Sequence, residues 1–110
     1  MDNTKPNTDQ PQPILSTAQL RHLLQTFKKQ HAKEYGLQAL GYFGSYSRQT
    51  ATEDSDIDII FDTNTPNLLL TAMMKQDLEE LLGKNVDVLR LHDAMNPTLK
   101  ARIQKEAVYV

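Results

Sequence analysis

Two neighbouring stretches decide the fold: GYFGSYSR at residues 41–48 and EDSDIDII at residues 53–60. Residues 37–43 are mostly apolar or aromatic and lie between glycines, which is typical of a short buried strand. Residues 56–61 alternate acidic with apolar side chains and then end in three apolar ones, which predicts a second strand with one polar face. Residues 44–52 between them predict a turn with room for one helical turn.

A long helix is expected before the first strand. Ser16 stands three residues before Gln19, which is the spacing of a capping box, and leucine and phenylalanine residues follow at helical intervals. We expect this helix to run from about Thr17 to about Tyr35 and to end at Gly36, since glycine commonly follows the last helical residue.

Two helices and one or two strands are expected after the second strand. Pro66 at the first helical position opens a helix that closes at Gly83, and Pro97 opens the last helix. Residues 86–91 predict a third strand, and residues 108–110 predict either a terminal strand or a frayed end. This order predicts an α/β fold with a small mixed sheet of three to four strands packed with helices.

The length of the chain allows one domain. The first thirteen of its 110 residues contain three prolines among polar side chains and offer almost nothing apolar to bury. We therefore expect residues 1–13 to form a flexible tail and residues 14–110 to form the folded domain. The remaining composition, with 39% hydrophobic and 24% charged residues, is ordinary for a soluble globular protein.

Composition excludes several classes of function. Twelve Lys and Arg against fourteen Asp and Glu give a net charge of -2, so no general binding of nucleic acid is expected. The absence of cysteine excludes disulfides, thiolate zinc sites and a cysteine nucleophile, and it is compatible with the cytoplasm. Apolar runs are only a few residues long, so we expect no contact with a membrane and no signal peptide.

The acidic residues of the second strand point to a metal. Side chains two apart in a strand share one face, so Asp56 and Asp58 project together while Ile57 and Ile59 project into the core. Two parallel carboxylates repel one another unless a cation lies between them. Because only oxygen ligands are offered, Mg²⁺ fits best, and it takes the rest of its ligands from water and substrate phosphates. A nucleoside triphosphate site is implied.

Three more residues complete the predicted site. Gly44 lets the backbone approach an anion closely, and Ser45 offers a hydroxyl and an amide at the start of a helical turn, so the pair is expected to cradle phosphates. Asp87 lies between two valines of the third strand, where an acid is unfavourable unless it is paired or bound to metal. With three carboxylates, two metal ions about 3.5–4 Å apart can clamp the oxygens of an in-line displacement.

The spacing of these residues resembles a known signature. Gly44 and Ser45, then ten intervening residues, then Asp56-Ile57-Asp58 is similar to the motif of DNA-polymerase-β-type nucleotidyltransferases. Arg48 also stands where minimal members of that family carry such a residue, whereas Gln49 replaces a glycine that is common there. The resemblance implies the polymerase-β-like nucleotidyltransferase fold, with Asp87 as the third aspartate.

The resemblance also implies a partner. Minimal members with this architecture are similar to the antitoxin of toxin–antitoxin pairs whose toxin is an all-helical HEPN ribonuclease. In that family the enzyme transfers AMP from ATP to a tyrosine of the toxin and silences it. The resemblance therefore implies a protein adenylyltransferase that requires Mg²⁺ and ATP, with catalytic and metal-binding roles for Asp56, Asp58 and Asp87. It likewise implies nucleotide contacts by Gly44 and Ser45.

Several alternatives remain open on the sequence. The chain can instead neutralise a toxin by forming a complex, without catalysis, or transfer a nucleotide to a small-molecule hydroxyl. Arg48 is either a phosphate contact or a surface cation that balances Glu53 and Asp54. Tyr46 either touches a base or is only a turn aromatic. Basic residues of the last helix, among them Arg102, are expected to form a solvated face or to meet an acidic partner.

Overall fold

A computed structural model describes residues 15–92 and 94–110, so the predicted tail at residues 1–13 lies outside the described residues. The four strands form one mixed sheet in the order β3-β2-β1-β4. Strand β1 pairs antiparallel with both β2 and β4, while β2 and β3 run parallel. The strands are β1 (Leu37–Phe43), β2 (Ile57–Thr63), β3 (Val86–Arg90) and β4 (Val108–Tyr109).

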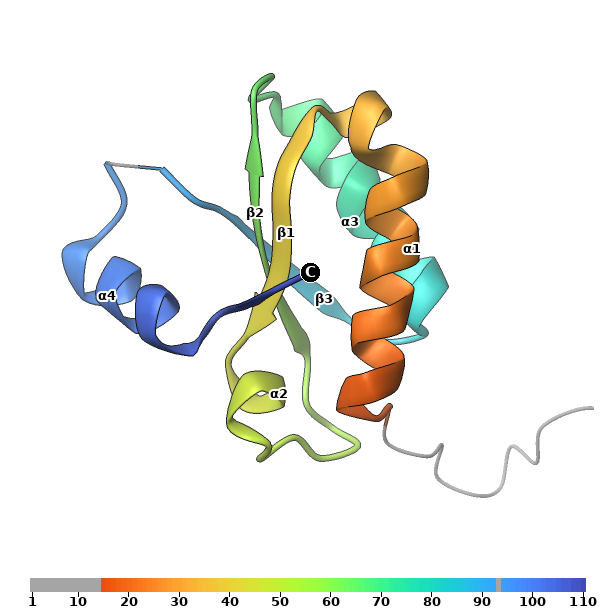
Figure 1. Ribbon diagram of the computed structural model, residues 1–110, viewed down its shortest axis with the longest axis vertical. Coiled ribbons are helices and arrows are strands. Elements are labelled where there is room, and N and C mark those ends of the chain that lie inside the picture. The colour runs from red at the N-terminus through yellow and green to blue at the C-terminus, as the bar shows by residue number, and fades with distance from the viewer. Residues whose placement is uncertain (1–14, 93) are drawn as a thin grey trace, which may run out of the picture.

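Helices cover both faces of this sheet. The helices are α1 (Thr17–Tyr35), α2 (Ser45–Arg48), α3 (Leu68–Leu82) and α4 (Pro97–Glu106). Helices α1 and α3 lie side by side against one face, whereas α4 lies on the opposite side of the sheet (Figure 1). Short helix α2 follows the end of β1 at the lower end of the sheet in this view. The predicted small α/β fold is confirmed.

Helix ends follow local capping rules. Ser16 and Gln19 form the predicted capping box of α1, and Gly36 closes the helix with φ 62°. The prediction that Pro66 is the first residue of α3 is wrong. Asn67 caps α3 instead, because its side chain accepts the Leu70 amide, and the proline therefore lies just outside the helix.

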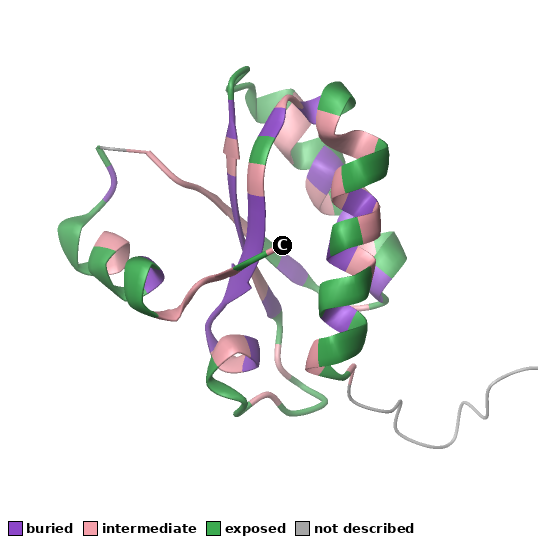
Figure 2. Cartoon of the chain, in the orientation of Figure 1, coloured by how far each residue is buried: buried purple, intermediate pink, exposed green. Residues whose placement is uncertain are grey.

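Strand β2 separates two apolar clusters. Ile57, Ile59 and Phe61 pack in the larger cluster with α1 and α3, whereas Ile60 packs with Phe43 of β1 in a smaller cluster under α4. Buried residues run along both central strands, as the purple segments of Figure 2 show. On the α4 side of the sheet, the smaller cluster covers Phe43 and Ile60. Asp58 lies on this same face, two residues before Ile60.

No helix in residues 15–92 and 94–110 combines the length and the apolar character needed to cross a membrane.

Candidate active site

Three elements bring the predicted acids to one edge of the sheet. Asp58 lies in β2 opposite Phe43 of β1 on one side and opposite Asp87 of β3 on the other. Paired positions on adjacent strands point to the same face, so Asp58 and Asp87 project together on the side of α4. Asp56 lies two residues before Asp58, immediately before β2 begins. Asp87 is exposed, so the expectation that it is an unfavourably placed acid does not hold, and what connects it with the other acids is its position beside Asp58.

The Gly44–Ser45 turn packs directly on Asp58. Gly44 has φ 72° and ψ -144°, a conformation that is essentially restricted to glycine. A Cβ atom built on Gly44 would lie 2.1 Å from Oδ2 of Asp58, so the backbone touches this carboxylate only because no side chain intervenes. Half-buried Ser45 begins α2 next to this contact. The turn and Asp58 are thus in direct contact.

Gln49 replaces the glycine expected from the resemblance, and its backbone shows why glycine suits that position. It caps α2 with φ 61° and ψ 35°, and its amide donates to the Ser45 carbonyl. A left-handed conformation costs an L-residue roughly 1–2 kcal/mol relative to glycine. This turn therefore holds a non-glycine residue in a strained backbone conformation.

Charge and burial both act on Asp58. Burial raises the pKa of its carboxyl above the ordinary value, and the like charges of Asp87 and Asp56 raise this pKa further. The positive charges of Arg102 and Arg48 lower the same pKa. The centre of the site is therefore a carboxylate that is poorly solvated and flanked by two other acids, an arrangement that a cation relieves.

Carboxylate oxygens of the three aspartates do not form a tight group. Among the described residues, one group of three possible metal ligands has all its ligand atoms within 4.8 Å of one another. It consists of His31, Glu34 and Asp77 and does not include the three aspartates. That group lies between α1 and α3, where Tyr35 donates a hydrogen bond to Asp77 and His31 Nδ1 lies 2.7 Å from Glu34 Oε1. These side chains therefore already have hydrogen-bond partners, and the Tyr35–Asp77 bond links the two helices.

Arg48 is engaged by a residue that the sequence did not indicate. Its Nη1 donates to both carboxylate oxygens of Glu106 in α4, at 3.0 and 3.2 Å. Arg102 Nε donates to the same carboxylate at 3.2 Å. One of the two alternatives for Arg48 paired it with Glu53 and Asp54, but the structure pairs it with Glu106, so that α2 and α4 are joined by an ion pair. No local spacing reveals it, because 58 residues separate the partners.

Tyr46 belongs to the core rather than to a nucleotide site. Only 2% of this residue is exposed, and it packs in the larger apolar cluster. Its hydroxyl is buried and has no hydrogen-bond partner within residues 15–92 and 94–110. A ring buried in this way is not available to a base, so Tyr46 instead anchors α2 to the sheet.

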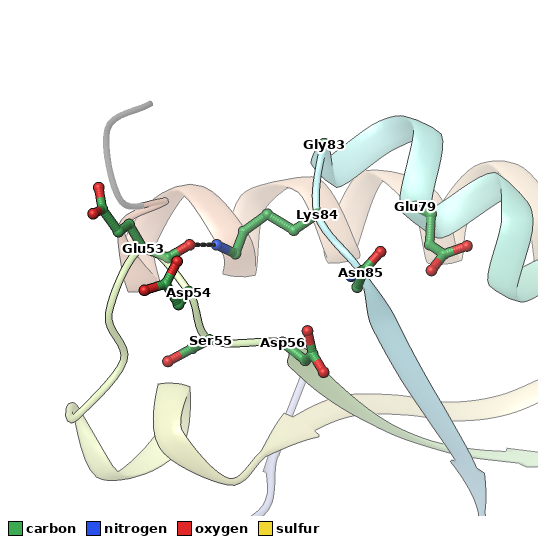
Figure 3. Close-up of a pocket in the computed structure, with 8 residues that line it drawn as sticks. All are labelled: Glu53, Asp54, Ser55, Asp56, Glu79, Gly83, Lys84 and Asn85. Carbon is green, nitrogen blue, oxygen red and sulfur yellow. Dashed lines mark hydrogen bonds between the residues drawn. The ribbon is translucent and has the colours of Figure 1, made fainter. Parts of the chain in front are cut away.

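An open groove of about 540 Å³ borders Asp56, but neither Asp58 nor Asp87 lines it. It lies between residues 53–56 and the turn at residues 83–85, and Asp56 contributes to its wall. Figure 3 shows Lys84 reaching across this groove to donate to the Glu53 carbonyl oxygen at 2.7 Å. Asp56 therefore borders open space next to the turn at residues 83–85.

The donor set fits a hard divalent cation. Every candidate ligand at this edge is a carboxylate oxygen, which suits Mg²⁺ better than a softer metal. Asp58 is half-buried, and the negative charges of Asp87 and Asp56 act on its carboxylate. The space between Gly44 and this carboxylate is open only because position 44 has no Cβ. These observations are consistent with Asp56, Asp58 and Asp87 as ligands and with the Gly44–Ser45 turn as the neighbouring anion contact.

A mixed sheet with helices on both faces, carrying acids beside a glycine–serine turn, defines a small α/β domain, and similarity to known proteins identifies its kind. Residues 23–110 match the family described as "Polymerase beta, Nucleotidyltransferase". The chain belongs to this family and is a nucleotidyltransferase.

Individual relatives agree with this family. The protein adenylyltransferase MntA of Thermococcus cleftensis is 34% identical over 98 residues, which cover 88% of this chain and 98% of that protein. A solved structure provisionally identified as a minimal nucleotidyltransferase is 31% identical with a TM-score of 0.72, covering 84% of this chain and 94% of its own. A toxin–antitoxin structure with AMP-PNP is 25% identical with a TM-score of 0.64, covering 86% of this chain and 72% of its own.

Proposed function

We propose that this chain is an antitoxin that transfers AMP from ATP to a tyrosine hydroxyl of a cognate HEPN ribonuclease toxin, in the cytoplasm. The observation that carries the proposal is the contact of the Gly44 backbone with Asp58, beside Asp87 on the next strand. Similarity to a protein adenylyltransferase and to a toxin–antitoxin structure with AMP-PNP supports the donor nucleotide and the kind of partner.

Each residue has a distinct role in this proposal. Asp56, Asp58 and Asp87 would hold Mg²⁺, which would neutralise charge on the phosphates and on the leaving group. The Gly44 backbone and Ser45 would orient the β- and γ-phosphates, since a backbone amide and a hydroxyl at the start of a helical turn donate to phosphate oxygens. Gly44 is suited to this because a side chain there would collide with Asp58.

The transfer itself is a displacement at the α-phosphorus. The acceptor oxygen forms a bond to this phosphorus, the bond to the bridging oxygen breaks, and pyrophosphate leaves. Asp87 takes the proton of the acceptor hydroxyl, because it is exposed and lies beside Asp58. Its exposure leaves room for an acceptor supplied by another protein.

Co-expression with the cognate toxin tests this function. Intact-mass spectrometry of the toxin should reveal one or more added AMP units, and Asp56→Asn together with Asp58→Asn should abolish them. Asp62→Asn is the matched control, because Asp62 lies on the same strand four residues further and accepts the Thr63 amide, away from the turn. An unmodified toxin that is still neutralised would instead indicate a non-catalytic complex.

A further inference from the structure

Helix α4 contributes two charged side chains to the edge that holds the acids. Ile103 is fully buried under this helix and fixes it against the sheet, with Phe43 and Ile60 beneath it. Arg102 and Glu106 are one helical turn apart, and their side chains form an ion pair of 3.2 Å. Because Glu106 also accepts Arg48 of α2, the two guanidinium groups are held on one carboxylate.

The arginine pair, defined as Arg48 and Arg102, lies beside the site rather than in bulk solvent. Arg48 belongs to the short helix that starts directly after Gly44, and its amide donates to the Gly44 carbonyl at 3.0 Å. Arg102 acts on Asp58 electrostatically more strongly than Arg48 does. Side-chain exposures of 43% for Arg48 and 49% for Arg102 leave the remaining donors of both groups accessible to a ligand.

We propose that Arg102 binds the triphosphate of the nucleotide together with Arg48, and that Glu106 is the positioning residue that holds the pair beside the acids. This inference rests on the function proposed above and extends it to a residue of the last helix. Guanidinium groups bind phosphate oxygens with two parallel hydrogen bonds, and each group here still has donors that Glu106 does not use.

Charge balance favours such a pair. Three carboxylates and a triphosphate together carry more negative charge than two magnesium ions neutralise. The described elements that face this edge supply Arg48 from α2 and Arg102 from α4 as the cations that act on Asp58. A guanidinium that already lies on a carboxylate loses little side-chain entropy when it moves to a nearby phosphate.

Equilibrium binding of α,β-methylene-ATP in Mg²⁺ tests the proposal without any acceptor. Arg102→Gln should weaken this binding at least about tenfold, the loss expected for one charge-assisted hydrogen bond, while binding of AMP should stay unchanged. Arg102→Lys keeps the charge but not the planar fork, so its affinity should be intermediate. Lys105→Gln is the matched control, since it removes one positive charge from the same helix, and it should bind both nucleotides like wild type.

Three results would contradict the proposal. Wild-type affinity of Arg102→Gln for the triphosphate would overturn the role of Arg102 alone. Equal loss of triphosphate and AMP binding would indicate that Arg102 only maintains the structure. Failure of the wild-type protein to bind α,β-methylene-ATP in Mg²⁺ would contradict the proposed function itself and the Arg102 role with it.

Discussion

Replacing Gly44 by alanine adds a single methyl group at the most crowded position of the site. The new Cβ would lie 2.1 Å from Asp58 Oδ2, far inside ordinary van der Waals contact. The backbone at φ 72° and ψ -144° adds its own strain, of order 1–3 kcal/mol for a non-glycine residue. Because the Asp58 carboxylate is the end of a side chain, it can rotate away, and the steric cost then appears as a displaced ligand.

We expect Gly44→Ala to lower the free energy of unfolding by about 3 kcal/mol, the upper part of the range for such backbone strain combined with moderate overpacking. Gly83→Ala is the matched control, since Gly83 also has positive φ, 68°, but its ideal Cβ meets no atom within 4 Å among the described residues beyond its own neighbours in the chain. This control should cost about 1 kcal/mol, from the backbone alone.

Urea unfolding of both variants measures the difference, and binding of α,β-methylene-ATP in Mg²⁺ measures the displaced carboxylate. Gly44→Ala should lose nucleotide binding, whereas Gly83→Ala should retain it. Equal destabilisation of the two variants, together with wild-type nucleotide affinity of Gly44→Ala, would refute the reasoning that the Gly44 backbone and Asp58 form one site.

Three further substitutions should maintain or raise the stability of the metal-free protein, as measured by urea unfolding in EDTA. Asp87→Asn removes a like charge beside Asp58 and should add up to about 1 kcal/mol at neutral pH. Since the pKa of Asp58 is raised, wild type should lose stability as pH rises through that pKa, and this variant should lose less. Tyr46→Phe should be neutral or stabilising by about 1 kcal/mol, because the buried hydroxyl has no partner. Gln49→Gly should stabilise by about 1 kcal/mol by relieving positive φ.

Local chemistry explains why much of this fold could be predicted from sequence. The capping box at Ser16 and the left-handed glycine at position 36 fix both ends of α1 without help from the rest of the chain. Alternation along residues 57–61 likewise fixes which face of β2 carries Asp58, because a strand has a period of two. Pro66 was wrongly predicted to be the first residue of α3, because both proline and asparagine are common where helices begin. The helix begins after Asn67, whose side chain caps it.

Long-range packing explains what the sequence did not reveal. Glu106 meets Arg48 only because α4 crosses back over the sheet, and Tyr46 is buried only because α2 turns toward α1 and α3. Neither contact has a spacing or a composition that marks it. The sequence could place Asp58 and Asp87 on strands because a strand has a local pattern, whereas the arginine pair depends on how helices are placed.

The most direct measurement of the central claim is nucleotide binding across a titration of Mg²⁺. Wild-type protein should bind α,β-methylene-ATP only when Mg²⁺ is present. The Asp56→Asn and Asp58→Asn double variant should not bind it at any Mg²⁺ concentration, while Asp62→Asn should behave like wild type. Binding by the double variant with an unchanged dependence on Mg²⁺ would contradict the claim that these aspartates hold the cation that carries the nucleotide.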